Sequence, residues 1–131
     1  MPYLAGENTM STNGNPFLRE ENYINGVWSA ADSGKTINVD NPATGTTIGT
    51  VPDCSTAEAE RAINAAAEAF KSWRKTTALE RANILLKMHD LVLENQEELA
   101  QLLTMEQGKP IAEARAEVGG SAAYLRWFAE E

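Results

Sequence analysis

The stretch TMEQGKPIAEA, residues 104–114, places Gly108, Lys109 and Pro110 between two runs with helical periodicity. A phosphate-binding P-loop needs a glycine five residues before its second glycine and Ser or Thr after its lysine. Leu103 and Pro110 occupy those two places, so the stretch cannot cradle a phosphate. Gly108 instead suits the left-handed residue that closes a helix, and Pro110 suits the first turn of the next helix. The stretch predicts a sharp corner between two helices.

Four helices are predicted between about residues 55 and 131. A capping box, in which a Ser, Thr or Asn and a Glu three residues later each bond the other's backbone N–H, is indicated at Ser55–Glu58, Thr77–Glu80 and Asn95–Glu98. The first helix carries an apolar stripe at helical spacing, made of Ala59, Ala62, Ile63, Ala66, Ala69, Phe70 and Trp73. The fourth is expected to point Ile111, Ala114, Val118, Ala122, Leu125 and Phe128 inward.

A small antiparallel β-sheet is predicted over about residues 23–51, ahead of these helices. Asn25-Gly26 lies between short apolar pieces and accepts the positive φ values of a type I′ hairpin turn. Residues 35–39 read as a strand, and a further strand through Ile48 and Val51 follows the turn residues Asn41, Pro42 and Gly45. The fold class is therefore α/β. Residues 1–21 are expected to form a disordered polar tail, within which Met10 is an alternative start to Met1.

Composition and charge exclude several classes of function. The chain has 131 residues, a net charge of −8 and one cysteine, Cys54. An excess of carboxylates argues against nucleic acid and against anionic membranes as partners. No apolar run approaches the roughly 20 residues of a membrane-spanning helix. A single cysteine permits no intramolecular disulfide and suits a reducing compartment, so a cytoplasmic location is expected.

No spacing in the chain indicates a catalytic constellation. Cys54 precedes a helix N-terminus, a position that can activate a thiol, but no histidine lies near it in sequence and an ordinary loop residue is favoured. His89, the sole histidine, has no second ligand at metal spacing. Gly119-Gly120 inside a helix costs about 1 kcal/mol per glycine relative to alanine. A bend, close packing or an approaching ligand would account for the pair, and close packing is favoured.

Taken in order, several segments resemble the N-terminal part of the NAD(P)-dependent aldehyde dehydrogenases, most nearly the succinate-semialdehyde dehydrogenases. These segments are YINGVW (23–28), NPATGTTIGTVP (41–52), AAAEAFKSWRKTTALERANILLK (65–87), LLTMEQGKPIAEARAEV (102–118) and YLRWFAEE (124–131). The resemblance implies that residues 22–131 open a Rossmann-like cofactor domain. It also implies that the chain is truncated, since the family continues into a catalytic domain and a small oligomerisation arm.

The resemblance assigns the chemistry to residues outside this chain. In the family a cysteine thiolate attacks the aldehyde, hydride passes to NAD or NADP, and a glutamate activates the water that releases the acid. These groups and the cofactor contacts belong to downstream motifs, and Cys54 matches none of them. The chain alone is therefore expected to have no catalytic or cofactor-binding residue and no activity. The full-length enzyme is expected to oxidise succinate semialdehyde to succinate as a homo-oligomer, a dimer or a tetramer.

Two minor sites also follow from the resemblance. The family holds a monovalent cation with a carboxylate and main-chain carbonyls that match Glu106, Val39 and Asp40; Glu106 as a plain helix-end carboxylate is the alternative. The helix after the corner lines the substrate entrance, where Gly120, Tyr124 and Trp127 fall; for Tyr124 and Trp127 a core stripe is the alternative. The rival to the enzyme as a whole is a non-catalytic helical module that binds a partner.

Overall fold

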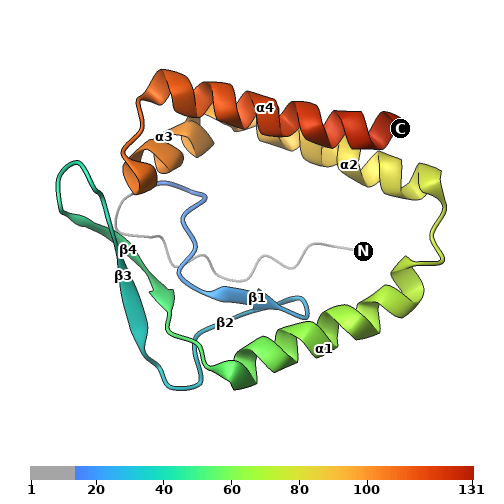
Figure 1. Cartoon of the computed structure of the whole chain (residues 1–131), viewed down its shortest axis with the longest axis horizontal. Coiled ribbons are helices and arrows are strands. Elements are labelled where there is room, and N and C mark those ends of the chain that lie inside the picture. Colours follow the sequence, from blue (N-terminus) through green and yellow to red (C-terminus); the bar gives the residue numbers. More distant parts are fainter. Residues whose placement is uncertain (1–13) are drawn as a thin grey trace.

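The computed structural model describes residues 14–131, so the first thirteen residues of the predicted tail, Met10 among them, lie outside the described part. The described elements are β1 (Asn22–Ile24), β2 (Val27–Ser29), β3 (Thr36–Asp40), β4 (Thr47–Pro52), α1 (Thr56–Trp73), α2 (Ala78–Glu94), α3 (Gln96–Gln107) and α4 (Ile111–Glu130). Figure 1 shows them as an open ring, with the hairpins and α1 along one side and α2, α3 and α4 along the other.

The strands form two separate antiparallel hairpins where a single small sheet was expected. In the first, Asn25 and Gly26 have φ values of 52° and 82°, and Ile24 pairs with Val27. This confirms the two-residue turn, because type I′ needs positive φ at both positions. The connection over residues 30–35 turns at Gly34, where φ is 68°, and β2 and β3 are not paired. The β3–β4 ladder has an irregularity at Val39/Asp40.

Two of the three predicted capping boxes are confirmed. Ser55 with Glu58 opens α1, and Thr77 with Glu80 opens α2. The third prediction is wrong, because the Asn95 side chain makes no cap hydrogen bond to α3. Its Nδ2 instead donates to the Leu91 carbonyl oxygen at 2.7 Å, inside α2. Asn95 is the single residue between the two helices, and its side chain bonds the end of the earlier helix.

The predicted corner is confirmed. Gly108 has a φ of 74°, and its N–H donates to the Thr104 carbonyl oxygen at 2.8 Å. The Pro110 carbonyl oxygen accepts from the N–H groups of Glu113 and Ala114, so α4 begins one residue after the proline. The left-handed glycine ends α3. Pro110 is the N-cap of α4, one residue before the first turn in which it was predicted, and its missing N–H leaves no donor unpaired.

The main core cluster lies between α3 and α4, and α2 packs along α4. The cluster consists of Ala100, Ala114 and Val118, with Val92, Leu99, Leu103 and Ile111 packed around them. The small residues at its centre let the two helices approach closely. Across the same contact the Arg115 guanidinium donates to both carboxylate oxygens of Glu97, at 2.7 and 2.9 Å. This hydrogen bonding lowers the pKa of Glu97 from 4.5 to about 2.

Gly119 is a point of close packing, as the sequence analysis favoured. A Cβ at this residue would lie 3.2 Å from Gln96 Nε2, which donates to the Arg115 carbonyl oxygen at 2.9 Å. Around Gly120, by contrast, a Cβ would meet nothing within 4 Å. The two neighbouring glycines therefore have different surroundings: Gly119 admits a side chain from α3, and Gly120 faces open space.

Several residues expected to point inward are exposed in the described chain. Ile63 is 66% exposed, Phe70 57% and Trp73 42%. These side chains are exposed because, among the strands, β1 makes the largest contact with α1, and no described helix packs closely along the stripe. On α4 the prediction holds for Ala114, Val118 and Ala122, which are buried, but is wrong for Phe128, which is 66% exposed. Within residues 14–131, no helix combines the length and hydropathy that crossing a membrane requires.

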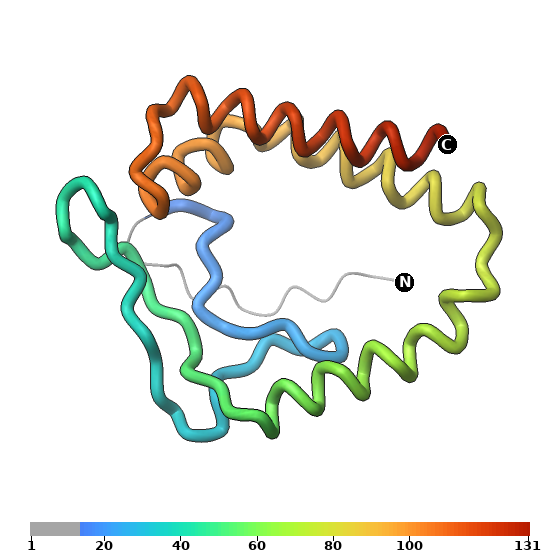
Figure 2. Tube along the Cα trace, viewed as in Figure 1, coloured from blue at the N-terminus to red at the C-terminus, as the bar shows by residue number. Residues whose placement is uncertain are grey.

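Residues 14–21, which the sequence analysis places in the polar tail, make specific contacts. Asn15 is buried, and its Nδ2 donates to the Glu98 carbonyl oxygen of α3 at 2.9 Å. Glu20 accepts a hydrogen bond from the Thr50 N–H of β4 at 2.8 Å. Figure 2 follows this part of the chain, in blue, from beside α3 to β1. The sequence signal failed here because both contacts join residues far apart in the chain.

Candidate functional site

One face of α4 carries an exposed apolar hollow of about 380 Å³. Five residues line it: Gly120, Ala123, Tyr124, Trp127 and Phe128. Their spacing of i, i+3, i+4, i+7 and i+8 places all five on one side of a helix. The three rings are 63–70% exposed and stand around the open space next to Gly120. The opposite face of α4, with Ala114, Val118 and Ala122, is the buried core.

The hollow brings together all three residues predicted for the substrate entrance. Tyr124 and Trp127 are 70% and 63% exposed within the described residues. Phe128 also belongs to the hollow but was assigned to the core, although its i+8 spacing from Gly120 was visible in the sequence. The lining offers alkyl and aromatic contacts and a single hydroxyl, on Tyr124. Such a surface can guide an apolar chain but supplies no nucleophile.

The segments predicted to hold a cation lie next to each other. A Cβ on Gly108 would fall 2.9 Å from Pro42 Cγ, so the turn after β3 presses on the corner after α3. Val39 and Asp40 lie just before that turn, at the ladder irregularity, and Glu106 is exposed in the last turn of α3. The Asp40 side chain accepts from the Thr47 hydroxyl at 2.7 Å. An interrupted ladder can leave carbonyl oxygens free for a ligand.

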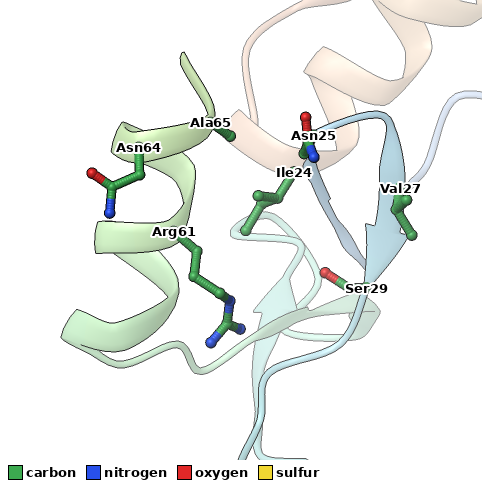
Figure 3. A pocket seen from close by; sticks show the side chains of 7 residues that line it. All are labelled: Ile24, Asn25, Val27, Ser29, Arg61, Asn64 and Ala65. Carbon is green, nitrogen blue, oxygen red and sulfur yellow. The ribbon is translucent and has the colours of Figure 1, made fainter. Parts of the chain in front are cut away.

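A second pocket, of about 520 Å³, lies between the β1–β2 hairpin and α1 (Figure 3). Its lining is Ile24, Asn25, Val27, Ser29, Arg61, Asn64 and Ala65. Arg61 is the only charged residue of this lining, and it already donates to both carboxylate oxygens of Asp32, at 2.7 and 2.8 Å. The sequence analysis did not find this pocket, because it depends on contacts between distant segments. Its charge is neutralised within the protein.

Glu58 is the buried carboxylate that ties this region together. It is 3% exposed and accepts from the Asp32 N–H at 2.8 Å, the Ser55 N–H at 2.9 Å and the Ser55 hydroxyl. The hydroxyl of Ser55 and then the Asp32 N–H lower the pKa of Glu58 to about 2. The carboxylate is therefore ionised at neutral pH and acts as an anchor between α1 and the segment after β2.

Neither Cys54 nor His89, the nucleophile and ligand candidates of the sequence analysis, lines either pocket. Cys54 is exposed, and its Sγ accepts from Asn22 Nδ2 at 2.8 Å. His89 Nδ1 lies 2.8 Å from Asp90 Oδ1 on α2. Among residues 14–131, no group of three or more His, Cys, Asp or Glu side chains is arranged to hold a metal ion. The hollow on α4 is the strongest candidate for a functional site in the described chain.

Comparison with solved structures defines the class of protein. The crystal structure of succinate-semialdehyde dehydrogenase from Burkholderia pseudomallei matches with a TM-score of 0.84 and 52% sequence identity, over 86% of this chain and 23% of that one. The fold is thus α/β and is similar to part of the Rossmann-like domain of the aldehyde dehydrogenases. Residues 28–131 match the aldehyde dehydrogenase family, and the chain belongs to that family.

Curated relatives agree on the family and differ in the named substrate. A 3-sulfolactaldehyde dehydrogenase of Pseudomonas putida is 53% identical over 114 residues, and a glutarate-semialdehyde dehydrogenase of the same species is 54% identical over 114 residues. Each alignment covers 87% of this chain and 24% of the relative. The chain therefore spans about a quarter of the length of the curated relatives it matches.

Proposed function

We propose that the full-length protein is an NAD(P)-dependent aldehyde dehydrogenase that oxidises succinate semialdehyde to succinate. The reaction consumes the aldehyde, one water and NAD(P)⁺, and yields the carboxylate, NAD(P)H and two protons. The observation that carries the proposal is the family match over residues 28–131, together with similarity to a succinate-semialdehyde dehydrogenase. NAD or NADP is the acceptor that the Rossmann-like fold and the family resemblance imply.

The substrate class rests on what the similar proteins are named for. Succinate semialdehyde, glutarate semialdehyde and 3-sulfolactaldehyde are all short aldehydes with an acidic group away from the reacting carbon. The hollow on α4 supports contact with the alkyl part of such a molecule, because its lining is almost wholly apolar. The distal anion requires a cationic partner outside this hollow, since Gly120, Ala123, Tyr124, Trp127 and Phe128 carry no positive charge.

Glutarate semialdehyde is the second candidate, favoured by the 54% identity to an enzyme named for it. It is longer by one methylene, and a site sized for the four-carbon aldehyde discriminates against the extra group by roughly 1 kcal/mol or more. We expect the full-length enzyme to have the highest kcat/KM for succinate semialdehyde, a few-fold lower for the five-carbon homologue, and far lower for butanal. A preference for the five-carbon homologue would replace the first candidate with the second. A preference for butanal would reject the anionic class altogether.

We propose that the hollow on α4 is one wall of the passage by which the aldehyde reaches the catalytic centre. Gly120 leaves the passage open, and Tyr124 and Trp127 contact the alkyl chain. The 131-residue chain alone is proposed to bind no cofactor and to catalyse nothing, since the family's cysteine, glutamate and cofactor motifs match none of its residues. A helical module that acts by binding a partner remains the alternative for the isolated chain.

We also propose a monovalent cation held by the carbonyl oxygens of Val39 and Asp40 and the carboxylate of Glu106. Hard oxygen ligands suit such an ion, and the Pro42–Gly108 contact supports the proximity of the two segments. Sodium ion at 100 times its Kd should raise the free energy of unfolding of the full-length enzyme by about 2–3 kcal/mol, which is measured as a higher Tm. The Glu106→Gln variant should lose most of this gain in stability. Glu113→Gln, a control at an exposed position in the first turn of α4, should keep it. An equal gain in both variants would remove Glu106 from the site.

A further inference from the structure

Residues 14–20 join the helical side of the ring to the strand side. At one end Asn15, only 9% exposed, donates from Nδ2 to the Glu98 carbonyl oxygen of α3 at 2.9 Å. Its Oδ1 accepts from the Phe17 N–H at 2.9 Å, and its carbonyl oxygen accepts from the Leu18 N–H at 3.3 Å. Because both halves of this buried amide are bonded, Asn15 fixes its own turn and the contact with α3 at the same time.

At the other end the segment is fixed to β4. Glu20 Oε1 accepts from the Thr50 N–H at 2.8 Å and from the Thr50 hydroxyl at 3.2 Å. A Cβ on Gly49 would lie 3.0 Å from Leu18 Cδ2, so the glycine leaves the space that Leu18 occupies against the strand. Arg19 adds a contact with β2, its guanidinium carbon lying 5.9 Å from the centre of the Trp28 ring.

The β3–β4 hairpin and α3 contact each other little at the junction that this segment spans. Among the helix–strand pairs, β1 and α1 make the largest contact. It lies across the ring from α3 (Figure 1). At the α3 end, the described chain offers the Pro42–Gly108 contact and the segment 14–20. We propose that residues 14–20 form a clasp that holds the β3–β4 hairpin against α3 and opens as one cooperative unit.

Cooperativity follows from the short distance between the two anchors. Asn15 and Glu20 are five residues apart, with a hydrogen-bonded turn and the packed Leu18 between them. Releasing one anchor frees the turn, and the freed turn no longer holds the other anchor in place. Local units of this kind open with a free energy below that of global unfolding, and amide hydrogen exchange reports each opening separately.

The test is amide hydrogen exchange in the 131-residue chain with Asn15→Ala, read at the Thr50 N–H. The substitution leaves the acceptor of that amide, Glu20, in place. Loss of a buried hydrogen bond is expected to accelerate exchange at Thr50 about tenfold, while amides in the middle of α2 keep their rates. The reciprocal variant, Glu20→Ala, should accelerate exchange of the Phe17 N–H by a similar factor, which covers the case in which the first variant does not fold.

Asn83→Ala, on the exposed side of α2, is the matched control and should leave the Thr50 rate unchanged. An unchanged Thr50 rate in Asn15→Ala, with Glu20 still bonded, would overturn the cooperative unit. An equal acceleration of all amides would also overturn it, because the segment would then be part of the global fold. Exchange at Thr50 in the unmodified chain as fast as in an unstructured peptide would show that the clasp does not form.

Discussion

Replacing Gly120 by phenylalanine in the full-length enzyme is expected to lower kcat/KM for the aldehyde by about tenfold or more. A Cβ at this residue meets nothing within 4 Å, so the ring would extend into the hollow lined by Tyr124 and Trp127. Blocking the passage should raise the free energy of the transition state, relative to free enzyme and aldehyde, by at least as much as one misfitted methylene does. That effect is about 1–3 kcal/mol. Steady-state rates of NAD(P)H formation over a range of aldehyde concentrations measure the effect.

Ser121→Phe is the control for this substitution. Ser121 is exposed and adjacent in sequence, but it lies about 100° around the helix and does not line the hollow. It should keep kcat/KM near the unmodified value. If Gly120→Phe keeps full activity with a normal helical spectrum, the hollow is not the entrance. If both variants lose activity equally, the effect is not specific to the hollow.

Gly108→Ala is expected to lower the free energy of unfolding of the 131-residue chain by about 2 kcal/mol. The left-handed conformation costs a residue with a Cβ roughly 1–2 kcal/mol, and Gly108 has a φ of 74°. The added methyl would also lie 2.9 Å from Pro42 Cγ, a ring atom that cannot turn aside. Urea unfolding followed by helical circular dichroism gives the change through the midpoint and slope.

Gly34→Ala separates the two causes. Gly34 has a similar φ of 68°, but a Cβ there meets nothing within 4 Å. It should therefore show the conformational cost alone, about 1 kcal/mol. An equal loss in both variants would mean that Pro42 does not press on the corner. A loss at Gly108 smaller than at Gly34 would contradict the arrangement of the turn after β3 against α3.

Features set by neighbouring residues could be predicted from the sequence. The Asn25-Gly26 turn, the caps at Ser55 and Thr77, and the corner at Gly108 all depend on φ preferences or on hydrogen bonds within three residues. Asn95 shows the limit of such rules. It lies between two helices, and its side chain bonds the last turn of α2 and not the first turn of α3. The division into two hairpins also depended on a connection with no strong local signal.

Features set by distant residues could not be predicted. Asn15 is a buried anchor only because α3 comes alongside it, 83 residues later in the chain. Helical spacing identified the faces of α4 but not which of its two apolar faces is covered, so Phe128 was assigned to the core. For the residues proposed to line the entrance, the resemblance to the family supplied the assignment, and the spacing of Gly120, Tyr124 and Trp127 explains why they form one surface.

The most direct test of the account is NAD(P)H formation by the full-length protein with succinate semialdehyde, with the 131-residue chain assayed beside it at equal concentration. The account predicts NAD(P)H in amounts equal to the succinate produced by the full-length protein, and none from the chain alone. Folded full-length protein that forms no NAD(P)H with succinate semialdehyde or its five-carbon homologue would contradict the proposed activity. NAD(P)H formed by the isolated chain would contradict the placement of the catalytic residues outside it.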